Sequence, residues 1–369
     1  AAIYGARASN GVIMVSTKKG EKGKPMIAFS AQIGSASPTN MYKSYDKNGY
    51  MTYKRDMQRA KNPKMVSYYY DDPNNLPAGV TLDIWRNASA NPQADNTKEW
   101  LSRLYFYQTE VDNYLNGNTV DWFSEAFGSG LRQKYDVNIS GGSDKMSYFW
   151  SVDYQDNEGV ITGDDYSAIR TRLNFDFTIT DWLTAGINTH FTDRDESAVP
   201  VDLSTMYYMS PYGSMFNEDG STKWYPNDYA LANPFLNYYG QDKLKKVNSV
   251  FASAYTNIKL PYNINYKISF QPNYTFASEY NFYPSSIPAG GQGGVASRAE
   301  SKNMSWIFDN LVSWKKQYGI HGFDVTLLFS AEKAQRYLTS ENNQKFIPNE
   351  NLTFSGIHFG TVPTVSSDD

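Results

Sequence analysis

The chain has 369 residues, a net charge of −4, no cysteine and a mean hydropathy of −0.58. No apolar run approaches the ~18 residues that a membrane-spanning helix needs, and the charge gives no reason to expect nucleic acid as a partner. Aromatic residues make up 16% of the chain, as is typical of aromatic girdles at membrane interfaces. A membrane β-barrel stays compatible with low hydropathy, because only alternate residues of its strands face lipid.

The first 20 residues combine a turn of small residues with a short predicted strand at 12–17. On the residues alone, this could be any turn and strand. The segment nevertheless resembles the end of the plug domain in the SusC/RagA-like family of TonB-dependent outer-membrane transporters of Bacteroidetes. The resemblance is ungapped, and its matching residues are Ile3, Tyr4, Gly5, Arg7, Ala8, Asn10, Gly11, Val12 and Ile13.

A predicted first strand at 25–34 is followed by a long insert at 35–118, which contains a helical stretch near 46–60. A structureless loop of this length is uncommon, so we expect the insert to carry its own elements and a function. Residues 119–127 read as a short capped helix that leads into the next strand.

Residues 133–157 predict a β-hairpin. Tyr148, Trp150 and Val152 alternate with polar residues, and Phe149 is the one exception. The turn at Gly141 and Gly142 supplies residues that accept a positive φ.

The later strands alternate in the same way. We expect their apolar residues on an outer, lipid-facing side and polar residues such as Arg172, Asn174, Asp176 and Asn188 on the inside. The predicted outward residues include Tyr148, Trp150, Phe175, Phe177, Ile187, Ile268, Trp306, Phe308, Leu327 and Phe329.

Short turns near Gly141, Thr180, Pro261 and Tyr318 alternate with mostly long connections. This sorting is typical of an outer-membrane barrel, with its short turns on one side and long loops on the other. We therefore predict an all-β fold, an antiparallel up-and-down transmembrane β-barrel. About nine strands are visible, out of roughly 22 in a barrel of the family.

Further segments resemble the early barrel of the same family, at 121–127, 138–143 and 158–161. The resemblance implies that residues 1–20 are the C-terminal end of the plug. Residues 21–369 would be the N-terminal part of the barrel, with long extracellular loops near 35–118, 196–246 and 340–369. Both ends read as cut, so we expect an internal fragment that stops in loop sequence.

The sequence offers no candidate for catalysis, for a metal site or for a cofactor. Its three histidines, at 190, 321 and 358, have no metal-ligand spacing, and no nucleophile motif is present. Residues 217–220 match only part of a calcium loop, and an ordinary turn fits them better. We therefore expect a protein that is not an enzyme.

Aromatic clusters in the long inserts are the better site candidates, because flat rings flanked by amides and carboxylates suit sugar faces or peptide side chains. Simple packing of the loops against one another is the competing interpretation. The candidates for substrate binding are Tyr68, Tyr69, Trp85, Tyr207, Tyr208, Trp224, Tyr225 and Tyr238.

The resemblance implies import of oligosaccharides or oligopeptides across the bacterial outer membrane. Its partners would be TonB, reached through a segment before residue 1, a SusD-like surface lipoprotein that acts as a lid, and outer-membrane lipid. Two alternatives stay open. One is a siderophore- or cobalamin-type receptor without the lipoprotein lid, and the other is a surface adhesin that does not transport.

Overall fold

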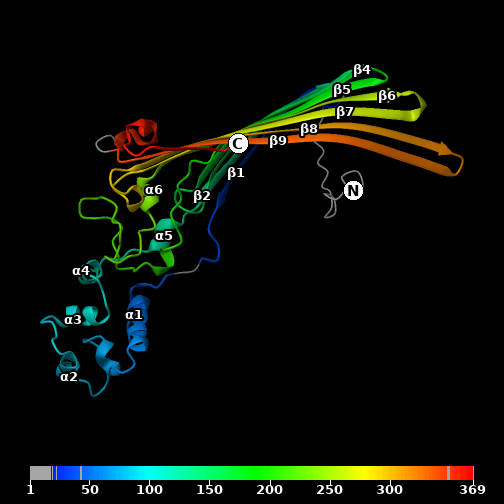
Figure 1. The fold of residues 1–369 in the computed structure, drawn as a ribbon. Coiled ribbons are helices and arrows are strands. Elements are labelled where there is room, and N and C mark those ends of the chain that lie inside the picture. The colour runs from blue at the N-terminus through cyan, green and yellow to red at the C-terminus, as the bar shows by residue number, and fades with distance from the viewer. Residues whose placement is uncertain (1–17, 19, 22, 42–43, 347–349, 369) are drawn as a thin grey trace.

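A single antiparallel sheet of ten strands, paired in chain order from β1 to β10, dominates the computed structural model (Figure 1). The structure describes residues 18, 20–21, 23–41, 44–346 and 350–368. The strands are β1 Gly23–Ala36, β2 Gly130–Gly142, β3 Met146–Glu158, β4 Asp165–Thr180, β5 Leu183–Asp195, β6 Asp242–Leu260, β7 Ile264–Tyr283, β8 Val295–Tyr318, β9 His321–Gln344 and β10 Thr364–Asp368. The predicted antiparallel meander is confirmed.

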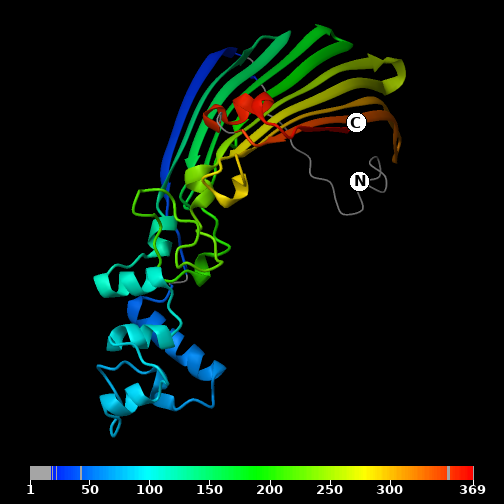
Figure 2. The same ribbon diagram turned by 60° about the vertical axis from the view of Figure 1, so that its left-hand side comes forward.

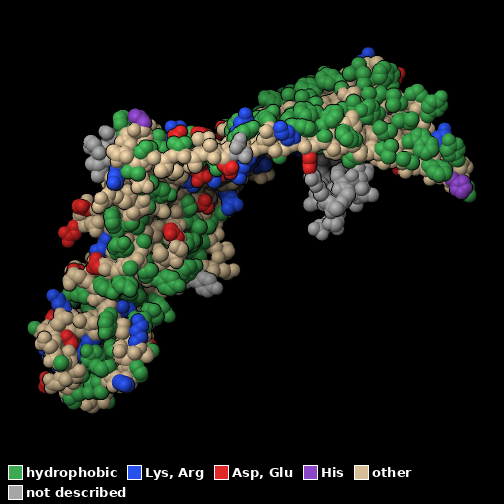
Figure 3. All heavy atoms as spheres, in the orientation of Figure 1, with side chains coloured by type: hydrophobic (Ala, Val, Ile, Leu, Met, Phe, Trp, Pro, Cys, Tyr) green, Lys and Arg blue, Asp and Glu red, His purple; other side chains and the backbone are tan. Residues whose placement is uncertain are grey.

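The two faces of the sheet differ in polarity, as the alternation predicts. Phe175 lies directly opposite Tyr148 and Ile187, and Phe270 lies opposite Phe308, so the apolar ladder continues from strand to strand. The sheet is bent into a trough (Figure 2), and its convex side is largely covered by apolar side chains (Figure 3). The predicted outward residues therefore share the convex face.

The concave face carries the polar partners of this ladder. Asn174 pairs with Asn188, and the Nδ2 of Asn174 donates a 2.8 Å hydrogen bond to the carbonyl of Lys18. Phe149, the exception to the alternation, lies opposite Asn174 and is buried. Lys18 therefore lies against the concave face.

Turns and inserts lie at opposite ends of the sheet (Figure 1). The tight turns join β2 to β3, β4 to β5, β6 to β7 and β8 to β9, while residues 37–129 and 196–241 connect the other ends. This arrangement is the predicted one, because consecutive antiparallel strands must alternate their ends.

The strands lengthen across the sheet, from 13 residues in β2 and β3 to 24 in β8 and β9. Each later hairpin therefore reaches farther at the turn end, which is the stagger that tilted strands of a barrel require. Because β1 and β10 lie at opposite edges of the described sheet, the sheet is an unclosed part of a barrel.

Three boundaries differ from the prediction. β6 begins at Asp242 rather than after 246, β9 continues to Gln344, and Thr364–Asp368 forms a tenth strand on β9 instead of ending in a loop. In these regions only isolated apolar residues, such as Leu244, Leu338 and Val365, stand among polar ones. A period-two apolar pattern is therefore absent, although the backbone still pairs.

The inserts contain most of the helices. The first insert carries α1 Lys47–Lys61, η2 Ser67–Tyr70, α2 Leu82–Asn87, α3 Asn96–Arg103, α4 Gln108–Asn116 and α5 Trp122–Ala126, and the second carries η3 Met206–Tyr208 and α6 Leu236–Gly240. The predicted helices near 46–60 and 119–127 correspond to α1 and α5. Shorter 3₁₀ turns are η4 Pro261–Asn263, η5 Pro288–Gly290 and η6 Glu350–Phe359.

No helix among the described residues combines the length and the apolar character that crossing a membrane requires. The plug-end motif (Ile3, Tyr4, Gly5, Arg7, Asn10 and Gly11) and the predicted strand at 12–17 lie outside the described residues.

Candidate substrate-facing surface

The two long inserts pack into one unit at the loop end of the sheet, although about 100 residues separate them. Tyr212 of the second insert enters the aromatic core of the first, where its ring lies 5.4 Å from Tyr114 and 5.9 Å from Phe106. The Trp122 indole donates to the Ser210 carbonyl at 2.8 Å. The surface that the inserts expose is therefore built jointly.

Three of the predicted site residues belong to, or pack against, the core of the helical part. Trp85 is fully buried, donates to the Asp71 carbonyl at 3.1 Å and stacks 3.7 Å from the Arg103 guanidinium. Tyr68 and Tyr69 pack partly buried against the same core. Trp85 therefore cannot lie on a binding surface in this conformation, and its predicted role as a ligand contact does not fit its burial.

Two buried charges of this helical part, Glu99 and Arg103, form an ion pair. Arg103 donates to Glu99 at 2.7 Å and also to the carbonyls of Tyr69 and Trp85. Burial alone would raise the pKa of Glu99, but hydrogen bonds from the Gln93 amide and from Arg103 outweigh it and lower this pKa. Ionised Glu99 therefore stabilises the fold of the helical insert.

Polar contacts also join the two inserts. Lys223 lies 2.8 Å from the Asp228 carboxylate, and its Nζ donates to Thr109 Oγ1 at 2.6 Å. The Thr109 amide donates to Asp228 at 2.8 Å, and Tyr107 stacks on Tyr229 with ring centroids 5.3 Å apart. These contacts fix the second insert against the start of α4.

The other predicted aromatics are accessible, and they lie in the second insert. Tyr207 and Tyr208 are exposed at 60% and 70%, whereas Trp224, Tyr225 and Tyr238 are exposed at 40%, 40% and 36%. The Trp224 indole donates to the Ser286 carbonyl at 2.6 Å, so its ring is held against the β7–β8 connection. The predicted candidates thus divide between the core of the first insert and the surface of the second.

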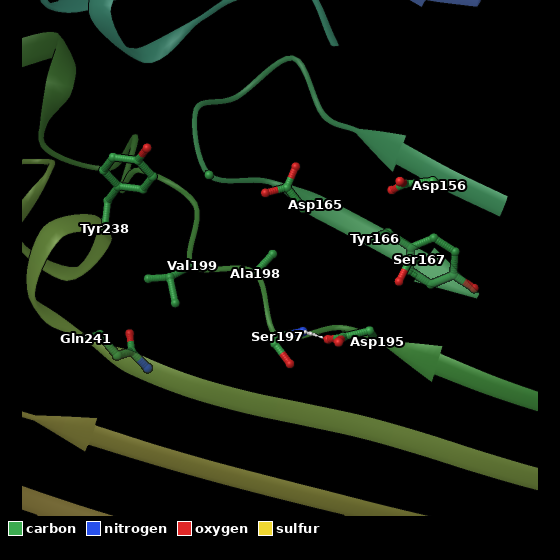
Figure 4. Close-up of a pocket in the computed structure, with 11 residues that line it drawn as sticks. Asp156, Asp165, Tyr166, Ser167, Asp195, Ser197, Ala198, Val199, Tyr238 and Gln241 are labelled. Atoms are coloured by element: carbon green, nitrogen blue, oxygen red, sulfur yellow. Dashed lines mark hydrogen bonds between the residues drawn. The ribbon is translucent and has the colours of Figure 1, made fainter. Parts of the chain in front are cut away.

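A cavity of about 440 Å³ lies where β3, β4 and β5 meet the second insert (Figure 4). Three carboxylates line it, Asp156, Asp165 and Asp195, and Tyr238 borders it from α6. Gly163 allows this close approach, because its φ is +80° and a Cβ there would collide with the Tyr238 ring. The register places Asp156 and Asp195 on the same face as the apolar outer ladder, so the cavity lies outside the concave channel wall.

The concave wall near the loop end is charged instead. Arg170 donates to Asp153 at 2.7 Å and to Gln155 at 2.9 Å, and Lys134 lies 3.5 Å from the same aspartate. The neighbouring Arg172 and His190 face each other across β4 and β5. These contacts place arginine, lysine, histidine and aspartate side chains on this part of the concave face.

The segment that resembled part of a calcium loop is a turn. Asp219 accepts hydrogen bonds from the backbone amide and hydroxyl of Ser221, and Phe216 pairs with Thr222. Within the described ranges, no group of histidine and acidic side chains is arranged to hold a metal ion.

Sequence reasoning did not identify the residues that join the inserts, above all Tyr212, Lys223 and Asp228. A tyrosine, a lysine and an aspartate in a polar loop carry no local signal, because their partners lie about 100 residues away in the sequence.

Comparisons with known proteins agree with the fold. No protein-family model matches the chain. It is 23% identical to TonB-dependent receptor P3 of Formosa agariphila over 98% of the chain and 32% of the relative. It is 24% identical to TonB-dependent receptor SusC of Bacteroides thetaiotaomicron over 47% of the chain and 12% of the relative.

Among solved structures, the RagAB peptide transporter is similar with a TM-score of 0.69 and 18% identity, over 99% of the chain and 41% of that chain. The open-open state of the RagAB peptide importer gives a TM-score of 0.66. The chain spans about a third of the length of the first curated relatives that it matches. In sequence the chain is therefore similar to TonB-dependent receptors, SusC among them, and in fold it is similar to RagAB, in each case over part of their length.

Proposed function

We propose that this chain forms part of an outer-membrane importer that works with TonB and a SusD-like surface lipoprotein. The observation that carries the proposal is how side-chain polarity and long connections are distributed over the sheet. Its convex face is apolar, its concave face is polar, and both long inserts lie at one end. A wall between lipid and an aqueous lumen has this arrangement.

We also propose a division of the chain. Residues 1–20 would end the plug, and residues 21–369 would build the first part of the barrel wall. The hydrogen bond from Asn174 to Lys18 supports this division, because it attaches Lys18 to the concave face.

The cargo would be an oligosaccharide or an oligopeptide. RagAB, similar in fold, is described as a peptide importer. The exposed tyrosines of the second insert and the charged concave wall suit either cargo, since rings stack on sugars and on side chains alike. The lipoprotein would cover the inserts, which are the surface farthest from the tight turns.

Deletion and complementation of the full-length gene test this function. We expect the deletion strain to lose growth on one oligomeric nutrient, the wild-type gene to restore it, and loss of TonB to abolish it. We also expect a surface lipoprotein to co-purify with the receptor. Uptake of a siderophore or cobalamin without such a lipoprotein would favour the alternative receptor type, and TonB-independent surface binding would favour an adhesin.

A further inference from the structure

A group of basic and aromatic side chains lies on the outer face of β7, β8 and β9, at the insert-side end of the apolar surface. Along β9 the outward residues run Val325, Leu327, Phe329 and Ala331, and then change to Lys333. Along β8 the apolar outward residues end at Met304 and are followed by Lys302. Lysine therefore occupies the first outward position beyond the apolar surface on both strands.

The register brings aromatic rings beside both lysines. Lys302 lies opposite Tyr337 on one side and Phe276 on the other, with its Nζ 5.9 Å from the centre of the Phe276 ring. Lys333 lies opposite Trp306. Between the two lysines is the pair Met304–Gln335, so they are offset by about 13 Å along the strands, at ~3.3 Å per residue.

The positive charge of this group is not neutralised by the protein. Among the described residues, Lys302 and Lys333 are exposed and form no ion pair. The nearest carboxylate on this face, Glu300, is engaged by the hydroxyls of Ser278 and Tyr280, and Arg298 stacks on the Tyr280 ring at 4.4 Å. The two ammonium groups are therefore available to an anion outside the protein.

Lysines with neighbouring aromatic rings at the edge of an apolar wall match the interface of a bilayer. The stem of a lysine lies along apolar surface while its ammonium reaches the headgroups, and rings of this kind lie at headgroup level. Negatively charged headgroups attract such lysines.

We propose that Lys302 and Lys333 bind the phosphate groups of an anionic lipid in the leaflet on the insert side. This proposal rests on the proposed function, because it requires the convex face to contact a bilayer. It adds a specific lipid contact on β8 and β9 that does not depend on the transported cargo.

The chain contains a matched control at the other end of the same strand. Lys316 lies on the same face of β8 as Lys302 and close to an aromatic ring, with its Nζ 5.6 Å from the centre of the Tyr318 ring. It lies beside the tight turn, so it would face the opposite leaflet.

The experiment uses the full-length protein in nanodiscs of neutral phosphatidylcholine that contain a small fraction of bisphosphorylated lipid A, and it measures retained lipid A by native mass spectrometry. We expect loss of about fivefold in lipid affinity for Lys302→Ala or Lys333→Ala, and roughly twentyfold or more for both. Lysine-to-arginine variants should retain binding. In a second arm, lipid A is present only in the leaflet on the insert side. There Lys316→Ala should retain lipid A as the wild type does.

Two results would overturn the proposal. One is wild-type retention of lipid A by the double alanine variant, and the other is equal retention of dephosphorylated lipid by the wild type. Heat-modifiable gel mobility separates the two levels of inference. A protein that fails to insert into the bilayer contradicts the proposed function itself, whereas an inserted protein that ignores phosphate contradicts only the lipid site.

Discussion

The aromatic residues of the inserts form two groups, one buried and one exposed. Trp85 has no exposed surface and holds Arg103 beneath its ring, whereas Trp224 and Tyr225 are exposed. An aromatic ring contributes to binding only where a ligand can reach it, so the two tryptophans should respond differently to the same substitution.

Trp85→Ala should destabilise the helical insert by about 3–5 kcal/mol, because it removes a fully buried ring and leaves a cavity. We expect limited proteolysis to cleave the insert faster, while heat-modifiable mobility of the barrel stays normal. Wild-type protease resistance in this variant would mean that the ring is not part of a core.

Replacing Trp224 and Tyr225 by alanine should reduce uptake of the natural oligomer without increasing proteolysis. Trp182 is a suitable control, because it is exposed to a similar degree but lies at the tight-turn end. Growth on the oligomer measures the effect. An equal loss of growth for Trp182→Ala would show that the insert surface has no special role.

The buried ion pair of Glu99 and Arg103 makes the helical insert sensitive to acid. The pKa of Glu99 is lowered on folding, so its stabilisation is complete above its unfolded pKa of about 4.3 and is lost as the pH falls through the lowered value. The protection of the α3 amides, corrected for their intrinsic exchange rates, should therefore fall as the pH drops through the lowered pKa of Glu99.

Glu99→Gln should weaken the insert at neutral pH, since Arg103 is then buried without a charged partner, and it should remove the loss of protection in acid. Asp83→Asn, at an exposed carboxylate, should leave the profile unchanged. An unaltered acid profile in Glu99→Gln would assign the sensitivity to another group.

At the scale of single strands, neighbouring residues lie on opposite faces of the sheet and therefore have different surroundings. Leu327 is 64% exposed on the outer face, and Leu328 is 38% exposed on the concave face. If the outer face contacts lipid, Leu327→Arg should cost roughly 2–4 kcal/mol near the bilayer midplane, while Leu328→Arg should cost much less. Unfolding from lipid vesicles measures both, and the reverse order would invert the assigned faces.

On the concave face, an arginine at position 174 should be destabilising. Asn174 is only 2% exposed and donates to Lys18, so an arginine there would break this contact and would not be a mild change. The alternation of the sequence alone predicts a milder effect of arginine at this position than on the outer face. The contact with Lys18, 156 positions away, argues against that prediction.

The strands and faces were predictable from the sequence because each membrane-facing strand repeats one local pattern, as in the hairpin with Tyr148, Trp150 and Val152. The extensions beyond the apolar surface, such as Asp242–Lys246 in β6, were not predictable. They carry isolated apolar residues, such as Leu244, but no period-two apolar pattern. The packing of the two inserts against each other was also not predictable, since contacts such as Tyr212 with Tyr114 depend on tertiary packing.

At the scale of the whole molecule, one open sheet has two different ends and two different faces. The tight turns and the inserts lie at opposite ends, the apolar and polar faces on opposite sides, and Lys18 on the concave side. The central claim is that the insert end is outside the cell and the turn end is in the periplasm.

Single cysteines test this claim most directly, because the chain has none of its own. Asn75→Cys, exposed in the first insert, should react with a membrane-impermeant maleimide on intact cells, and Ile320→Cys, 92% exposed at the β8–β9 turn, should react only after the outer membrane is permeabilised. The unsubstituted full-length protein controls for thiols elsewhere. Labelling of Ile320→Cys on intact cells, with Asn75→Cys protected, would contradict the account.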